Sequence, residues 1–245
     1  MAILPYFRSQ SLKVEAKPGD VFDPVTLADK AAERVMRDIL SERRPQDGIL
    51  GEEYAQTLGT SGLTWVLDPI DGTRGFMSGT PTWGVLIALS DETGPLYGVI
   101  DQPYIAERFE GGFGRAALTG PQGNMELATR TTQNLSDAIL FSTFPEVGTT
   151  PERQAFEAVA EKAKLTRYGT DCYAYGLLAA GQIDLVIEAG LHPYDIHAPI
   201  AVVQAAGGIV TNWDGGAAHP GGRVIAAANA NIHAQALAFL KDTAG

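Results

Sequence analysis

The chain has 245 residues, with 18 Lys or Arg against 29 Asp or Glu, so its formal net charge is −11. This acidity argues against a protein that binds the nucleic-acid backbone, which requires a basic surface. A hydrophobic fraction of 45% with 19% charged residues is typical of a folded protein rather than a disordered one. The single cysteine, Cys172, excludes an intrachain disulfide, and no apolar run is long enough for a transmembrane helix. We expect one domain over residues 1–245, located in the cytoplasm, without a secretion signal and without membrane contact.

The first half of the chain predicts one helix followed by strands. Apolar residues recur at three- and four-residue steps from Val25 to Leu40, with Pro24 suited to a first helical position, so a helix is predicted from about Asp23 to Arg43. Next comes a short strand over 64–68. Two β-hairpins are then predicted, the first from 82–89 and 96–100, the second from 108–110 and 116–118.

In the second half, strands alternate with helices. Strands are predicted over 139–143, 184–189, 209–211 and 224–228, and helices over 151–163, 172–180, 195–206 and 231–240. Hairpins followed by alternating elements indicate an α+β fold in layers rather than a simple doubly wound sheet.

The segment 65–73 (Trp-Val-Leu-Asp-Pro-Ile-Asp-Gly-Thr) holds the most informative motif. An apolar strand is expected to deliver Asp68 at its end, Pro69 to turn the chain, and Asp71 to follow three residues later. Two carboxylates and the carbonyl of Ile70 then converge, and hard divalent cations prefer such oxygen ligands. The amides of Gly72 and Thr73 suit a phosphate. Taken alone, the motif is better explained as a capped turn after a strand.

Three further acids lie where α/β folds place their sites. Each has an ordinary structural explanation. Glu52 belongs to a pair of adjacent acids typical of a solvated surface, Asp29 suits a capping box, and Asp195 suits the start of a helix.

Four segments in order along the chain together resemble the inositol monophosphatase family of Mg²⁺-dependent, lithium-sensitive phosphatases. They are 23–29 with Glu33, 51–53, 65–73, and 194–198 ahead of 206–208. The resemblance implies the αβαβα sandwich of that family, a homodimer, and a small phosphorylated metabolite as substrate.

The same resemblance implies roles for individual residues. The first Mg²⁺ is expected at Glu52, Asp68 and the carbonyl of Ile70; the second at Asp68, Asp71 and Asp195; and a third, weaker ion at Glu52. Thr73 and Asp29 are expected to orient and deprotonate the attacking water, so Asp29, Thr73 and Glu52 are the candidate catalytic residues. Gly72, Thr73 and Arg74 are expected to bind the phosphate end of the substrate. The physics agrees, because crowded carboxylates repel one another unless cations offset their charge.

Within the family, the chain most resembles the histidinol-phosphate phosphatases. The supporting segments are 72–89, 101–103, 107–108, 167–175 and 193–195. Asp171 and Glu188 are expected to flank the organic part of the substrate, where two carboxylates complement an ammonium and an imidazole. A helix cap at Asp171 and a strand-end salt bridge at Glu188 are the structural alternatives. His192 differs from the histidinol-phosphate phosphatases and is closer to the inositol phosphatase pattern. Pro199 is expected in the first turn of its helix.

Other readings stay open at this stage. The substrate is alternatively inositol monophosphate or another small sugar or nucleotide phosphate, and a non-catalytic interaction protein on the same fold is a third reading. Several eye-catching residues are expected to be structural: Gly112 and Gly114 as hairpin glycines, Cys172 as a small buried residue, and Phe76 with Trp83 as core. His192 and His197 are not expected to ligate metal.

Overall fold

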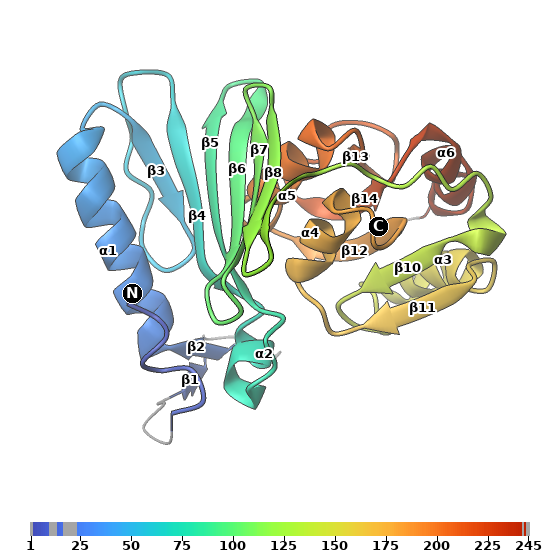
Figure 1. Ribbon diagram of the computed structural model, residues 1–245, viewed down its shortest axis with the longest axis horizontal. Helices are drawn as coiled ribbons and strands as arrows, with labels where there is room; N and C mark the ends of the chain where they lie inside the picture. Colours follow the sequence, from blue (N-terminus) through green and yellow to red (C-terminus); the bar gives the residue numbers. More distant parts are fainter. Residues whose placement is uncertain (1, 10–13, 17–23, 242, 244–245) are drawn as a thin grey trace.

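The computed structural model describes residues 2–9, 14–16, 24–241 and 243. Its elements form five layers, helix–sheet–helix–sheet–helix, which Figure 1 shows from left to right. This is the layered αβαβα sandwich expected from the sequence. Helices α1 (Leu27–Arg43) and α2 (Thr73–Ser78) accompany the large sheet, and α3 (Thr150–Ala160) and α6 (Ala230–Leu240) cover the outer face of the small sheet. Helices α4 (Tyr173–Ala179) and α5 (Pro193–Ala205) lie between the two sheets.

The large sheet has seven strands that neighbour one another in chain order. All pairs are antiparallel except the first, which is parallel. The strands are β3 (Gly48–Gly51), β4 (Thr64–Asp71), β5 (Gly84–Asp91), β6 (Gly94–Gln102), β7 (Glu107–Gly112), β8 (Arg115–Gly120) and β9 (Gly123–Glu126). The predicted hairpins are β5–β6 and β7–β8, and Gly112 and Gly114 lie at the turn of the second, as expected.

The small sheet has five strands in the order β11-β10-β12-β14-β13. Strand β10 is parallel to both of its neighbours, and β14 is antiparallel to both of its own. The strands are β10 (Ile139–Ser142), β11 (Leu165–Tyr168), β12 (Leu185–Leu191), β13 (Ile209–Asn212) and β14 (Gly222–Ala227). A two-stranded ribbon, β1 (Val14–Ala16) with β2 (Pro24–Thr26), and a short 3₁₀ helix, η1 (Leu135–Asp137), complete the fold.

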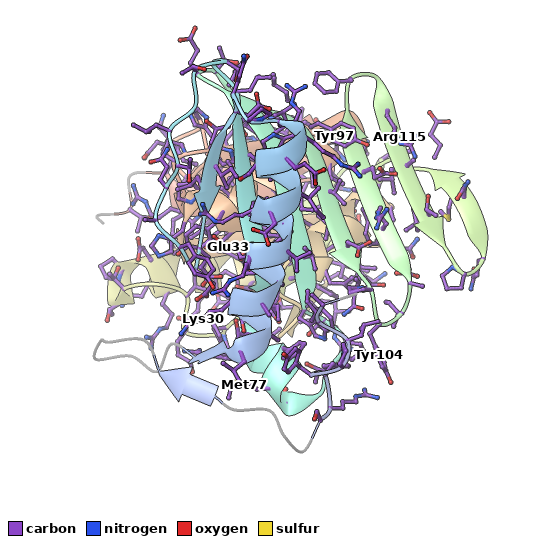
Figure 2. The ribbon with its side chains drawn as sticks, turned by 90° about the vertical axis from the view of Figure 1, so that its left-hand side faces the viewer. Lys30, Glu33, Met77, Tyr97, Tyr104 and Arg115 are labelled. Atoms are coloured by element: carbon purple, nitrogen blue, oxygen red, sulfur yellow. The ribbon has the colours of Figure 1, made fainter. Side chains whose placement is uncertain are left out.

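Three apolar cores hold the layers together. The largest lies between the sheets around α4 and α5, a second lies between the small sheet and α3 and α6, and a third lies beneath α1 and α2. The third contains Phe76 and Trp83, both fully buried and edge-to-face at 4.9 Å, which confirms that they are core residues. Figure 2 shows α1 lying across the outer face of the large sheet, with Glu33 near its middle. No helix in the described ranges is both long and apolar enough to cross a membrane.

The structure corrects three boundary predictions. Helix α1 begins at Leu27, because Pro24 belongs to strand β2, and Asp23 lies outside the described residues. Strand β4 does not stop at Asp68 but runs to Asp71, with its pairing to β5 interrupted in between, where Pro69 has no N–H to donate. Helix α5 begins at Pro193, so Pro199 lies inside it rather than in its first turn. Strands β1, β2, β3, β9 and β11 had no clear signal in the sequence.

Candidate active site

Strand β4 carries its acids into the interior because its preceding residues are apolar. Val66 and Leu67 are buried in the sheet, and Asp68 beside them is only 2% exposed. Oδ1 of Asp68 accepts the backbone N–H of Ile70 at 3.0 Å, which bends the strand at Pro69. The bend falls where the ladder to β5 is interrupted, so Asp68 and Asp71 leave the regular alternation of the strand.

Gly72 turns the chain from β4 into α2. Its φ of +83° lies in the left-handed region, and a Cβ there would lie 2.8 Å from Cγ of Asp171, so a side chain is excluded on both grounds. The turn places Thr73 at the first helical position. Its hydroxyl lies 3.1 Å from the carbonyl oxygen of Ile70 and 3.5 Å from Oδ1 of Asp29, which is buried on α1. The pair Thr73 and Asp29 expected from the sequence therefore lies together.

Two backbone donors fix the other acids. The N–H of His192 donates to Oδ2 of Asp195 at 2.6 Å, in a capping arrangement at the start of α5. The N–H of Cys172, at the start of α4, donates to Oδ2 of Asp71 at 2.6 Å. Asp195 is thus a helix-capping acid, as its position predicts, and it also faces the acids of β4.

Asp68, Asp71 and Asp195 form a compact carboxylate cluster. One oxygen from each lies within 4.8 Å of the others, among the described residues. Burial raises the pKa of Asp68 well above its usual range, and the charges of Glu52 and Asp71 raise it further. Burial, and to a smaller extent repulsion from Asp171, raises the pKa of Asp71 well above its usual range. Burial raises the pKa of Asp195 to about 7. Without an added positive charge, the cluster holds protons that acids in water would release.

This cluster fits a hard divalent cation. Its donors are all carboxylate oxygens, which Mg²⁺ and Ca²⁺ prefer over nitrogen or sulfur. Their mutual repulsion is the electrostatic signature of a site completed by a cation, whose charge restores the ionised forms.

Glu52 reaches the same pocket from the loop after β3. The carboxylate of Glu33, which is fully buried on α1, accepts the N–H of the next residue, Glu53, at 2.7 Å and pairs with Arg37 at 2.7 Å. A Cβ on Gly51 would lie 2.0 Å from the Glu33 carboxylate, so glycine is required for this approach. Through these contacts, Glu33 holds the backbone on both sides of Glu52 against α1.

A single pocket of about 380 Å³ collects the predicted site residues, a volume suited to a small metabolite. Those that line it are Glu52, Asp68, Ile70, Asp71, Gly72, Thr73, Arg74, Asp171, Glu188 and Asp195. Asp29 is not in the lining and approaches through Thr73. Every one of these residues comes from a strand end, a turn or the first turn of a helix, except Asp68 and Glu188, which lie inside strands.

Outside this cluster and Glu52, the acids that line the pocket are Asp171, Glu188 and the exposed Glu146, and the sequence singled out the first two. Burial raises the pKa of Asp171 to about 6, and its φ of +44° is strained for a residue with a side chain. Burial raises the pKa of Glu188 to about 7, against the opposing effect of hydroxyl donors from Thr143 and Tyr175. The alternative roles considered for these acids do not apply: Cys172 is the cap of α4, and the ion pairs of the described residues do not include Glu188.

Sequence reasoning missed one wall of the pocket. Residues 142–144 and 146–148, at the end of β10 and just after it, line it together with Tyr175 and residues 189–192 and 194. The parallel pairing of β10 with β12 was the available signal, since the carboxyl ends of parallel strands meet at one edge of a sheet. Tyr175 lies four residues after Asp171, one helical turn on, and was assigned only to the helix.

Cys172 is a small buried residue, as expected from the sequence, whereas His197, expected at the surface or the substrate edge, is buried and lies away from the pocket. Burial raises the pKa of the Cys172 thiol, so it is not an activated nucleophile. His197 lies outside the pocket lining, with one ring nitrogen 2.8 Å from the Ser90 hydroxyl and the other 2.9 Å from the carbonyl of His219.

Comparison with known proteins places this geometry in a family. The profile described as "Inositol monophosphatase family" matches residues 2–243. The "Bifunctional phosphatase IMPL2, chloroplastic" of Arabidopsis thaliana is 40% identical over 250 residues, covering 98% of this chain and 70% of its own. The "Histidinol-phosphatase" of Mycobacterium tuberculosis is 34% identical, covering 96% and 90%. The solved structure of an inositol monophosphatase from Zymomonas mobilis superposes with a TM-score of 0.85 at 38% identity, covering 98% and 91%. The chain belongs to the inositol monophosphatase family of phosphatases.

Proposed function

We propose that this chain is a Mg²⁺-dependent phosphomonoesterase that hydrolyses histidinol phosphate to histidinol and phosphate. The family consists of metal-dependent phosphatases, and the carboxylate cluster of this chain is able to hold a metal ion. The observation that carries the choice of substrate is the pair Asp171 and Glu188, a half-buried and a buried acid in the same pocket as the cluster. Two carboxylates suit an ester whose organic part bears an ammonium and an imidazole.

At the phosphate end, the proposal assigns metal ligation to Glu52, Asp68, the carbonyl of Ile70, Asp71 and Asp195. Mg²⁺ bound there supplies positive charge that neutralises the phosphate dianion, acidifies water and stabilises the leaving alkoxide. The protein's part is to hold these oxygens in place. It does so through the Ile70, Cys172 and His192 amides, each of which donates to one carboxylate.

The attacking water is assigned to Thr73 and Asp29. The Thr73 hydroxyl lies between the Ile70 carbonyl and Asp29, so its proton has an acceptor on either side and its oxygen is free to accept from water. Asp29 is buried and accepts the released proton through this hydroxyl. Gly72 and Thr73, with Arg74 one residue on, bind the phosphate oxygens.

The experiment is phosphate release from histidinol phosphate and from inositol 1-phosphate, side by side, with Mg²⁺ and with EDTA. The proposal expects a clear preference for histidinol phosphate and no activity in EDTA. An equal or reversed preference contradicts the choice of substrate, and activity that survives EDTA contradicts the mechanism.

Inositol monophosphate is the second candidate substrate. The 38% identity to the Zymomonas mobilis inositol monophosphatase supports it as strongly as the histidinol-phosphatase relatives support the first. Asp171→Asn tests the specificity role of Asp171 that the first candidate requires. It is expected to raise KM for histidinol phosphate at least tenfold and to leave an aryl phosphate unchanged, because only the first carries a cation. The homodimer, the cytoplasmic location and the single domain over 1–245 remain predictions.

A further inference from the structure

The carboxylate of Glu188 accepts hydrogen bonds from two hydroxyl groups on different elements. The phenol of Tyr175, on α4, donates to Oε2 at 2.9 Å. The hydroxyl of Thr143, the residue after β10, donates to Oε1. Since Glu188 itself lies on β12, three elements meet at this one carboxylate. All three side chains line the pocket.

These two hydrogen bonds leave the Glu188 carboxylate able to accept further hydrogen bonds from a bound ligand. Tyr175 and Glu188 are 2% and 7% exposed, so neither group turns to bulk water. A carboxylate offers about four acceptor positions, and a hydroxyl supplies one proton, so two donors leave about half of the acceptor capacity unused. Asp171 repels Glu188 electrostatically, and no cation of the described residues is paired with it. The remaining acceptor positions are therefore suited to hydrogen-bond donors on a bound molecule.

We propose that Tyr175 and Thr143 are positioning residues that hold Glu188 in one orientation, so that the site favours phosphate esters whose organic part donates hydrogen bonds. The preferred donor is an ammonium or protonated imidazole, because its charge also offsets the repulsion from Asp171. The inference rests on the proposed function, since it concerns the organic end of the same pocket.

The competing explanation is that the Tyr175 hydrogen bond merely ties α4 to the sheet. The chain offers a matched control for this. Tyr173, on the same helix, donates its hydroxyl to Glu107 at 2.5 Å, and neither of these residues lines the pocket. Tyr173→Phe removes the same kind of bond from the same helix without touching Glu188.

The test compares Tyr175→Phe, Tyr173→Phe, Thr143→Val and Thr143→Ser with the wild type in Mg²⁺. The substrates are histidinol phosphate, inositol 1-phosphate and p-nitrophenyl phosphate, which has no donor on its organic part. Tyr175→Phe and Thr143→Val are expected to raise KM about tenfold for whichever natural ester the wild type prefers, as expected for loss of a hydrogen bond to a charged group. KM for p-nitrophenyl phosphate and kcat should change less than twofold. Thr143→Ser keeps the hydroxyl and should restore KM.

The outcomes separate the two proposals. Equal losses on the natural ester and on p-nitrophenyl phosphate, or equal effects of Tyr175→Phe and Tyr173→Phe, overturn the positioning role while leaving the proposed function standing. A wild type that prefers inositol 1-phosphate contradicts the choice of histidinol phosphate, yet a selective KM effect on that ester still supports the positioning role. If Tyr175→Phe fails to fold, the comparison of Thr143→Val with Thr143→Ser decides the question.

Discussion

The backbone N–H of Cys172 donates to Oδ2 of Asp71 at 2.6 Å, joining two residues 101 positions apart in the chain. Asp71 ends strand β4 of the large sheet, and Cys172 caps α4, which lies between the sheets. Asp195, on the other inter-sheet helix, completes the carboxylate cluster. The site is therefore assembled across layers, and no single segment of the chain carries it.

Asp68 is the acid whose loss should cost the most activity. It is buried, and its pKa is raised by burial and by four neighbouring acids. Asp68→Asn should lower kcat/KM in Mg²⁺ by about a thousandfold, equivalent to ~4 kcal/mol of transition-state stabilisation. In EDTA, its melting temperature should equal or exceed that of the wild type, because a repelling carboxyl has been removed. Asp38→Asn, at an exposed position on α1, is the control and should change neither quantity. If the Asp68→Asn variant keeps more than a tenth of wild-type activity, the assignment of Asp68 as a metal ligand is contradicted.

Mg²⁺ should stabilise the protein through the same cluster. A ligand that binds only the folded state at 100 times its Kd adds about 2.7 kcal/mol to the free energy of unfolding. We expect the melting temperature to rise by several degrees on adding Mg²⁺ and to fall back with EDTA. In Asp71→Asn the rise should shrink or vanish. An equal rise in that variant would show that the ion binds elsewhere.

The free energy of unfolding should depend on pH through Glu188. Its folded-state pKa is about 7, above the ordinary value of 4.5, so the protonated form is favoured by folding. The associated stability is fully present below about pH 4.5 and is lost as the pH rises through 7. In EDTA, Glu188→Gln should match the wild type near pH 5 and exceed it in melting temperature at pH 8. Glu157→Gln, exposed on α3, should show no such divergence. Parallel curves for Glu188→Gln and the wild type would contradict the pKa shift.

The layered fold was predictable because its elements carry strong periodic signals. Both hairpins of the large sheet and the alternation in the second half appear in the structure near their expected positions. Strand β3 was missed because only four residues, two of them glycines, form it. The start of α1 was misplaced because Pro24 suits a first helical turn and an edge strand equally well.

The candidate acids of the site came from the resemblance to a known family, because each of them taken alone has an ordinary structural explanation. Their partners were not predicted. Tyr175 looks like any aromatic residue of a buried helix, and only the packing of α4 against β12 brings its hydroxyl to Glu188. Pro199 was placed wrongly because α5 begins two residues earlier than expected. At its true position it has no N–H for the carbonyl of Asp195, four residues before it.

The N-terminal segment, residues 2–9, contacts α2 at its C-terminal end. The guanidinium of Arg8 donates twice to the carbonyl of Gly79, the residue that caps α2, at 2.8 and 3.0 Å, and once to the Tyr104 hydroxyl at 2.7 Å. It also lies 4.7 Å from the centre of the Tyr104 ring. Arg8 adopts a φ of +58°, a strained value that its contacts must offset. In Figure 2, Tyr104 lies beside α2 at the lower end of the large sheet.

Because α2 is only six residues long and begins at Thr73, loosening its end should disturb the catalytic hydroxyl. Arg8→Ala should lower kcat about three- to tenfold on every ester, natural or aryl, with little change in KM, since misplacing a reacting group costs rate more than binding. Arg223→Ala is the control: Arg223 also packs over an aromatic ring and donates to a carbonyl, but on the small sheet. Both variants lose a ring contact and hydrogen bonds, and Arg223→Ala also loses an ion pair with Asp214, so it should lose at least as much stability and only a catalytic role would make Arg8→Ala the slower enzyme. Equal kcat values for the two variants would show that the contacts of Arg8 serve stability alone.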